Sequence, residues 1–229
     1  MLSILIPSVR ETIYRCVDHI LRVSTSINTD FEIVICSKQK LNFSSPKVRV
    51  VAEDIDNIGS IKPINKCFSE SQGEYFLVTC DDIIMHGNAM AIPEFVESQA
   101  FDGRKYKICS IGYSSYHNHY VPYEPVGQID ENMRIPILSF PAGSRNTVDT
   151  LLDGVIFNES YKHIAADNWL SWYLNSNGEP PAFMSNTPMG YGFDTRAEAS
   201  LCVRQEDLDL LRKMILLSQT RNMNYNCKV

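Results

Sequence analysis

The chain has 229 residues, of which 44% are hydrophobic and 21% are charged, and this ordinary globular composition excludes a fibrous or intrinsically disordered protein. Its formal net charge of -6 provides no overall positive charge with which to bind nucleic acid. The seven cysteines are odd in number and lack C-x-x-C spacing, which excludes a fully paired disulfide framework and argues against a structural zinc site.

The first residues, MLSILIPSVRE, form a short apolar run without a basic leader or a small-residue cleavage site. We therefore expect a strand at this end and not a signal peptide. No apolar stretch approaches the roughly 20 residues that a membrane-spanning helix needs, so a soluble, cytoplasmic protein is expected.

The first part of the chain alternates strand-like runs with amphipathic helices. One helix is predicted over 12–24, where apolar residues recur every three or four positions, and a second between Ser60 and Gly73. The strand-like runs lie at 2–7, 31–36, 48–51 and 74–80. This alternation predicts a doubly wound α/β fold with a mainly parallel sheet flanked by helices, which binds ligands beyond the carboxyl ends of its strands.

The second part of the chain departs from this rhythm. From about 101 to 149, tyrosine, proline and polar residues separate short strand-like runs, as expected of an elaborated region that faces a substrate. The stretch AADNWLSWYLNSNG predicts another helix, and RQEDLDLLRKMILLSQ a final amphipathic one. Between them, SNTPMGYGFDTR has the glycine content and position of a mobile flap.

Two adjacent carboxylates, Asp81 and Asp82, follow the fourth strand-like run. Like charges this close raise each other's pKa unless a cation lies beside them. A hard divalent ion suits the position, because Mg²⁺ and Mn²⁺ prefer oxygen ligands and need only one or two carboxylates. A solvated turn or a helix cap explains the pair alone equally well. The position after a strand favours the metal.

Four blocks of the sequence, in this order, resemble the GT-A nucleotide-sugar glycosyltransferases of the bacterial family 2 kind: LSILIPSVRE, FEIVICSKQ, NIGSIKPINKCFSESQGEYFLVTCDDI and LLDGVIFNESYKHIAADNWLSWYLNSNG. The resemblance covers roughly Leu2 to Gly178. It implies a single GT-A domain in which residues 1–100 bind the nucleotide-sugar, 101–180 carry the acceptor and catalytic half, and 181–229 form a flap and a helix. The activity implied is sugar transfer to a hydroxyl acceptor.

The resemblance also implies which positions hold the donor. Those that match the turn bordering the nucleotide base are Pro7, Ser8, Arg10 and Glu11. Those that match the approach of the central helix are Asn57, Gly59, Lys62 and Asn65. Asp82 matches the last acid of the metal motif and Asp81 its middle position, which implies Mn²⁺ or Mg²⁺ as cofactor and a UDP-, GDP- or dTDP-sugar as donor.

Asp167 matches the acid that serves as base in inverting members. A carboxylate whose pKa is raised by partial burial is suited to take the proton of an acceptor hydroxyl, expected here to be a carbohydrate. Direct displacement then inverts the anomeric centre. An aspartate at the start of a helix is also a common N-cap, and both roles can hold at once.

The sequence departs from the family pattern at four positions. The second strand ends in Cys36 and Ser37, where aspartates usually grip the nucleotide, although Ser37 is retained in the predicted donor site. Cys80 replaces the first acid of the metal motif, and Ala166 replaces the glutamate that often precedes the base. We therefore expect weaker metal binding than is usual in the family.

Two further groups of residues have ambiguous patterns. His117 and His119 would lie on one face of an extended segment, but without a third ligand nearby in sequence a loop or acceptor contact is expected. Gly143 and Arg145 fit either a contact with the donor or an ordinary turn.

Three other functions compete with sugar transfer. A catalytically silent sugar-binding or scaffold protein is consistent with the missing acids at Cys36 and Cys80. A sugar nucleotidyltransferase would need a glycine-rich loop after the first strand, and PSVRE contains no glycine. Transfer to modified DNA bases is disfavoured by the net charge. Self-association and peripheral contact with a membrane are left open.

Overall fold

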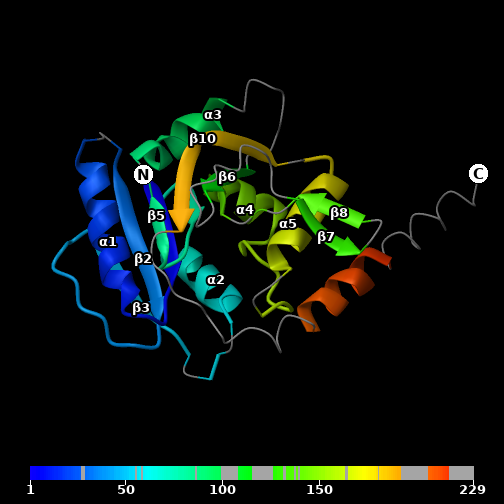
Figure 1. Ribbon diagram of the computed structural model, residues 1–229, viewed down its shortest axis with the longest axis horizontal. Coiled ribbons are helices and arrows are strands. Elements are labelled where there is room, and N and C mark those ends of the chain that lie inside the picture. The colour runs from blue at the N-terminus through cyan, green and yellow to red at the C-terminus, as the bar shows by residue number, and fades with distance from the viewer. Residues whose placement is uncertain are drawn as a thin grey trace, which may run out of the picture.

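The computed structural model describes residues 1–26, 29–54, 56–57, 59–85, 87–98, 108–114, 126–130, 133–136, 138, 140–162, 165–179, 181–191 and 206–216. Within these residues, eight strands form one sheet in the order β3-β2-β1-β4-β9-β6-β10-β5, and β7 and β8 form a separate two-stranded ribbon (Figure 1). Helices cover both faces of the large sheet.

The first half of the large sheet is parallel, as the sequence predicts. Its strands are β1 (Leu2–Pro7), β2 (Phe31–Ser37), β3 (Val48–Ala52) and β4 (Tyr75–Val78). The helices between them are α1 (Thr12–Val23) and α2 (Ile61–Glu70). A 3₁₀ turn, η1 (Ser24–Ser26), follows α1.

The apolar run of β1 is continuous because its two faces are covered by different helices. Ile4 and Ile6 belong to the apolar cluster that contains the buried face of α1, whereas Leu5 belongs to the cluster that contains the buried face of α2. Alternate residues of β2 divide between the same two clusters. This arrangement confirms the doubly wound α/β architecture.

The second half of the sheet is mixed. After β5 (Ile83–Met85), η2 (Gly87–Ala91) and α3 (Ile92–Ser98) come the remaining strands, which are β6 (Ile108–Ser114), β7 (Val126–Asp130), β8 (Met133–Pro136), β9 (Pro141–Ser144) and β10 (Ala182–Tyr191). The strand β9 lies antiparallel between β4 and β6, and β10 runs parallel to β6 and antiparallel to β5. Residues 185–191 of the predicted flap SNTPMGYGFDTR therefore belong to the central sheet.

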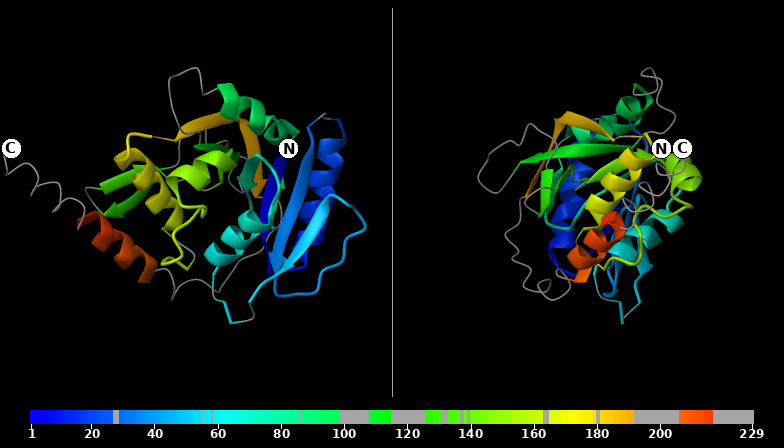
Figure 2. Two further views of the ribbon diagram at one scale, coloured as in Figure 1. Left: turned by 180° about the vertical axis from the view of Figure 1, so that it is seen from behind. Right: turned by 90° about the vertical axis from the view of Figure 1, so that its right-hand side faces the viewer.

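Three helices accompany the second half of the chain: α4 (Arg145–Leu151), α5 (Ala166–Ser176) and a helix over 206–216. Leu211 and Ile215 of the last helix join the apolar cluster that contains Leu170 and Leu174 of α5. Figure 2 shows this last helix, in orange-red, beside the yellow α5 in both views. None of the helices in the described part of the chain is long and apolar enough to cross a lipid bilayer.

A close backbone contact fixes the loop before α2. Gly59 has φ +98, and a Cβ at this position would lie 1.9 Å from the carbonyl oxygen of Lys162. The same carbonyl accepts a 3.3 Å hydrogen bond from the Ile61 N–H, and the Lys162 N–H donates a 3.0 Å bond to Asp207 Oδ1. Only glycine fits this approach, so the glycine of the Asn57-x-Gly59 motif has a steric cause.

Candidate functional site

The carboxyl ends of four parallel strands meet at one edge of the sheet. Pro7 pairs with Cys36 and Cys36 with Val51, so β1, β2 and β3 end at the same level. Beyond these ends, the Ser8 N–H donates to the Cys36 carbonyl, the Glu53 N–H to the Ser37 carbonyl and the Thr79 N–H to the Leu5 carbonyl. The residues that follow the strands therefore lie along this edge, which is where α/β sheets bind ligands.

At this edge, a carboxylate cluster made of Ser8, Arg10, Asp81 and Asp82 joins the loop after β1 to the turn after β4. Ser8 Oγ donates a 2.8 Å hydrogen bond to Asp81 Oδ2. The Arg10 guanidinium lies 3.2 Å from Asp81 Oδ1 and 3.5 Å from Asp82 Oδ2. Both carboxylates thus converge on one cationic group.

The cluster is largely removed from solvent. Asp81 and Asp82 are only 2% and 8% exposed, whereas the Arg10 side chain is 31% exposed. Burial raises the pKa of Asp81, and the Ser8 hydroxyl and the Arg10 charge oppose that rise only in part. A buried carboxylate of this kind needs a compensating positive charge, which Arg10 provides.

Cys80 contributes no negative charge to the cluster. Burial, followed by the charges of Asp82 and Asp81, raises the pKa of its thiol to about 12. The thiol is therefore protonated at neutral pH and is a poor ligand for a hard cation. Beneath the turn, Cys16 Sγ lies 3.6 Å from the carbonyl oxygens of Cys80 and Ile83, which anchors the turn to α1.

The carboxylate oxygens of this cluster fit a hard divalent ion whose remaining coordination positions are filled by water and by a bound phosphate group. Asp81 and Asp82 offer carboxylate oxygens that already converge on a positive charge. Among the described residues, no group of three or more His, Cys, Asp or Glu side chains is placed to enclose a metal. Mg²⁺ and Mn²⁺ commonly bind one or two carboxylates and complete their shells with water and phosphate oxygens, so the set present is sufficient.

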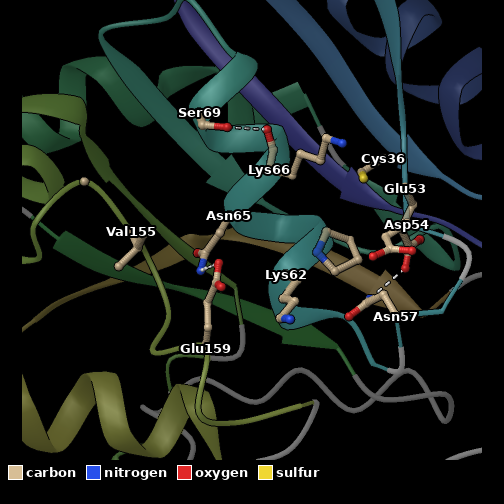
Figure 3. Close-up of a pocket in the computed structure, with 12 residues that line it drawn as sticks. Cys36, Glu53, Asp54, Asn57, Lys62, Asn65, Lys66, Ser69, Val155 and Glu159 are labelled. Atoms are coloured by element: carbon tan, nitrogen blue, oxygen red, sulfur yellow. Dashed lines mark hydrogen bonds between the residues drawn. The ribbon is translucent and has the colours of Figure 1, made fainter.

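A cleft of about 350 Å³ opens beside the ends of β2 and β3. In Figure 3, the side chains of α2 lie in the middle of this cleft. Glu53, Asp54 and Asn57 lie on one side of them, and Val155 and Glu159 lie on the other. Lys62 and Lys66 of α2 also line it. Charged side chains of both signs line the cleft, and it reaches the carboxyl edge through Cys36 and Glu53.

The predicted donor residues at this cleft have different surroundings. Asn57 Nδ2 donates a 2.7 Å bond to Glu53 Oε1, which orients that carboxylate. Asn65 is buried, and its side-chain amide exchanges hydrogen bonds with the Phe157 backbone, at 2.8 Å to the carbonyl and 3.1 Å from the N–H. Asn65 therefore positions the loop opposite α2, while Lys62 is exposed at the cleft.

The remaining predicted residues of the edge are spread around its rim. Pro7 is the last residue of β1, and Glu11 is an exposed residue just before α1. Ser37 is buried at the end of β2, where its Oγ accepts the Gln39 N–H at 3.1 Å. Sequence reasoning missed Glu53, although it is the first acid after an apolar run, the same signal that indicated Asp81.

Asp167 lies in the first turn of α5 but is not its N-cap. The N-cap is Ala165, which has φ 63, and Asp167 Oδ1 accepts the Asn168 N–H at 2.9 Å. Burial raises the pKa of Asp167, and this hydrogen bond lowers it less. Within the described part of the chain, Asp167 makes no hydrogen bond or ion pair with the carboxylate cluster.

Arg145 lies at the opposite edge of the sheet. Its guanidinium donates to the carbonyl oxygens of Gly73, Phe68 and Ser71 and stacks over the Phe68 ring at 4.2 Å. This residue joins α4 to the end of α2 and is no part of the carboxylate cluster. The predicted pair His117 and His119 lies outside the described residues.

The fold is that of known glycosyltransferases. No protein-family model and no curated protein matches the sequence. The structure of S. aureus TarS 1-349 in complex with UDP-GlcNAc matches with a TM-score of 0.61 and 15% identity, over 87% of this chain and 60% of that one. The complex with UDP matches with a TM-score of 0.55 and 17% identity, over 84% and 60%.

A longer structure of the same protein, S. aureus TarS, matches with a TM-score of 0.60 and 16% identity, over 84% of this chain and 36% of that one. TarS is a GT-A-type glycosyltransferase. The chain thus spans about three fifths of the length of the TarS 1-349 structures and shares their GT-A fold, as the sequence predicts.

Proposed function

We propose that the protein is a glycosyltransferase that moves a sugar from a UDP-sugar to a hydroxyl acceptor. The observation that carries the proposal is the convergence of Asp81 and Asp82 at the carboxyl edge of a GT-A sheet, beside a cleft lined by charged side chains of both signs. The crystal structures with this fold that contain UDP-GlcNAc and UDP support the choice of donor. The acceptor that suits this chemistry is a carbohydrate hydroxyl.

The nucleotide would lie along the edge between the carboxylate cluster and the cleft. Ser8 and Glu53 directly follow β1 and β3, and Ser37 is the last residue of β2 between them. These three residues would face the base and ribose. The second strand ends in Cys36 and Ser37 and therefore has no carboxylate for the ribose hydroxyls. Glu53, which is held by Asn57, would supply that carboxylate as the hydrogen-bond acceptor. Lys62 lines the cleft and would supply a cation for the diphosphate.

Negative charge accumulates on the diphosphate as the bond to the sugar breaks. Mn²⁺ or Mg²⁺, with Asp82 and Asp81 as ligands, would stabilise that charge as a Lewis acid. The hydroxyl of Ser8 holds Asp81 in place for this task. Asp167, with its raised pKa, would take the proton of the acceptor hydroxyl as that oxygen attacks the sugar, and a single displacement inverts the anomeric centre.

Thermal unfolding with a panel of nucleotide sugars, with and without Mn²⁺, tests the proposal, because a ligand that binds only the folded state raises its stability. We expect a UDP-sugar to raise the midpoint, more so with Mn²⁺, and Asp82→Ala to abolish the metal-dependent part. Asp167→Asn should retain the donor shift but transfer sugar at least about a hundredfold more slowly. If no nucleotide sugar shifts the midpoint, the proposal is wrong.

A second candidate function is a catalytically silent sugar-binding or scaffold protein. The observation in its favour is Cys80, whose protonated thiol stands where an acid often completes the metal motif. It predicts binding of sugar without any dependence on Mn²⁺. Release of UDP from a UDP-sugar, measured with and without acceptor, separates the two candidates, since a silent protein releases none.

A further inference from the structure

Arg10 occupies the position at which the two carboxylates need a positive charge. Its guanidinium spans Asp81 Oδ1 at 3.2 Å and Asp82 Oδ2 at 3.5 Å, and the second oxygen of Asp81 accepts the Ser8 hydroxyl. Both oxygens of Asp81 are therefore engaged by the protein itself. A planar guanidinium that bridges two separate carboxylates is a defined geometry, which a single lysine could not reproduce.

The charge of the cluster explains why such a bridge is needed. Two nearly buried carboxylates alone would place two like charges in a region of low polarity, which is unfavourable. With Arg10 the cluster carries a formal charge of about minus one, so the folded chain is compensated without a metal ion. The residual charge still repels a free diphosphate and still attracts a dication.

A dication and Arg10 are therefore competitors for the same carboxylates. A metal ion bound to Asp82 would lie close to the guanidinium, and the two positive charges repel each other. Arg10 belongs to the short loop between β1 and α1, and its side chain is 31% exposed, so it can turn away from Asp82 without movement of the core. A diphosphate is the partner that a displaced guanidinium and a newly bound metal ion would share.

We propose, as an extension of the proposed function, that Arg10 is the cation of the carboxylate pair in the protein without ligands, and that the donor diphosphate takes over its guanidinium when a metal ion binds Asp82. Metal and nucleoside diphosphate then bind cooperatively. Arg10 restrains the binding of metal alone and strengthens the binding of metal together with the donor.

Binding of Mn²⁺ alone provides the test, because it requires no activity. Free Mn²⁺ is measured by electron paramagnetic resonance during titration of the wild type, Arg10→Met and Arg15→Gln. Arg15 is an exposed arginine of α1, five residues further on, and its substitution controls for the loss of one positive charge. We expect Arg10→Met to bind Mn²⁺ about tenfold more tightly than the wild type, and Arg15→Gln to match the wild type.

The same titration with UDP measures the cooperativity. UDP should tighten Mn²⁺ binding to the wild type by about tenfold or more, and this gain should be smaller in Arg10→Met. Unchanged or weaker binding of Mn²⁺ alone to Arg10→Met would overturn the inference. If Arg10→Met does not fold, the double variant Arg10→Met/Asp81→Asn is used instead, because Asp82 is then the single carboxylate left without Arg10. The double variant should bind Mn²⁺ about tenfold more tightly than Asp81→Asn alone.

The outcomes for the inference and for the proposed function are separable. If UDP binds no variant under any condition while Arg10→Met still tightens Mn²⁺ binding, the proposed function fails and Arg10 remains a competitor of the metal. If UDP and Mn²⁺ bind the wild type cooperatively but Arg10→Met leaves Mn²⁺ binding unchanged, the function stands and the role of Arg10 is wrong.

Discussion

The two edges of the parallel sheet each carry a carboxylate held by a serine and an arginine, with opposite consequences. At the amino edge, Glu32 accepts the Ser3 hydroxyl at 2.7 Å and pairs with Arg49 at 3.1 Å. At the carboxyl edge, Asp81 accepts the Ser8 hydroxyl and pairs with Arg10. The partner types are the same, yet the pKa of Glu32 is lowered and that of Asp81 is raised.

The difference lies in burial and in the number of carboxylates that share one arginine. Burial alone would raise the pKa of Glu32, but the N–H of Gln72, the Ser3 hydroxyl and Arg49 outweigh it. Asp81 is more deeply buried, and it shares Arg10 with Asp82. The amino edge therefore stabilises the fold with its carboxylate, whereas the carboxyl edge retains one at a cost in stability, as expected of a ligand site.

The largest expected effect separates the two edges by function. Asp82→Ala should reduce sugar transfer by about a thousandfold or more, because the proposed metal ion loses a carboxylate ligand and the diphosphate its Lewis acid. Glu32→Ala should leave the transfer rate of the folded protein unchanged, since Glu32 lies at the other end of the strands. Initial rates with a UDP-sugar, per mole of folded protein, measure both. Equal losses in the two variants would contradict the division.

The reverse pattern is expected for stability. Glu32→Ala should lower the free energy of unfolding by about 2 kcal/mol, since it leaves the Gln72 N–H, the Ser3 hydroxyl and Arg49 without their shared acceptor. Urea unfolding at pH 7, followed by circular dichroism, gives the value. Asp82→Ala is the matched variant at the other edge and should lose less. A larger loss in Asp82→Ala would mean that the carboxyl edge stabilises the fold.

The parallel half of the fold was predictable because its signals are local. The apolar run of β1 predicts a strand and the helical spacing of α1 predicts a helix, and both elements lie where they were predicted. The antiparallel strand β9 was not predictable, because PAGS has no apolar or β-branched pattern and pairs only through its neighbours β4 and β6. Tertiary contacts decide such a strand.

The candidate site shows the same division. The Asp81 and Asp82 pair was visible as two acids after a strand, whereas the Arg10 bridge depends on a loop about 70 residues away in sequence. Asn65 was predicted to approach the donor, but its amide contacts the Phe157 backbone, 92 residues further on. Ala165 is the N-cap of α5 with a positive φ, a position at which alanine gives no sequence signal.

Asp81→Asn should reveal the cost of the buried charge at the carboxyl edge. The amide can accept from Arg10 with its oxygen and donate to Ser8 Oγ with its nitrogen, so both partners remain satisfied. At pH 7 we expect the free energy of unfolding to rise by up to about 1 kcal/mol, while Mn²⁺-dependent donor binding weakens. A loss of stability in this variant would show that the charge of Asp81 supports the fold.

The smallest expected effect is a difference in pH dependence between the edges. A carboxyl group whose pKa is raised on folding binds its proton more readily in the folded state, so its contribution to stability is present at low pH and is lost as the pH rises through the folded pKa. The free energy of unfolding of the wild type should therefore rise relative to that of Asp81→Asn as the pH falls from about 7 toward the ordinary carboxyl pKa near 4.

Glu32 should respond in the opposite sense. Because its pKa is lowered on folding, its contribution is present above the unfolded value and is lost as the pH falls through the folded one. The stability advantage of the wild type over Glu32→Gln should therefore shrink only below about pH 4. Urea unfolding of the wild type and both variants across this range measures the two differences. If the curves for the two variants run parallel, the edges do not differ in the way their hydrogen bonds and burial indicate.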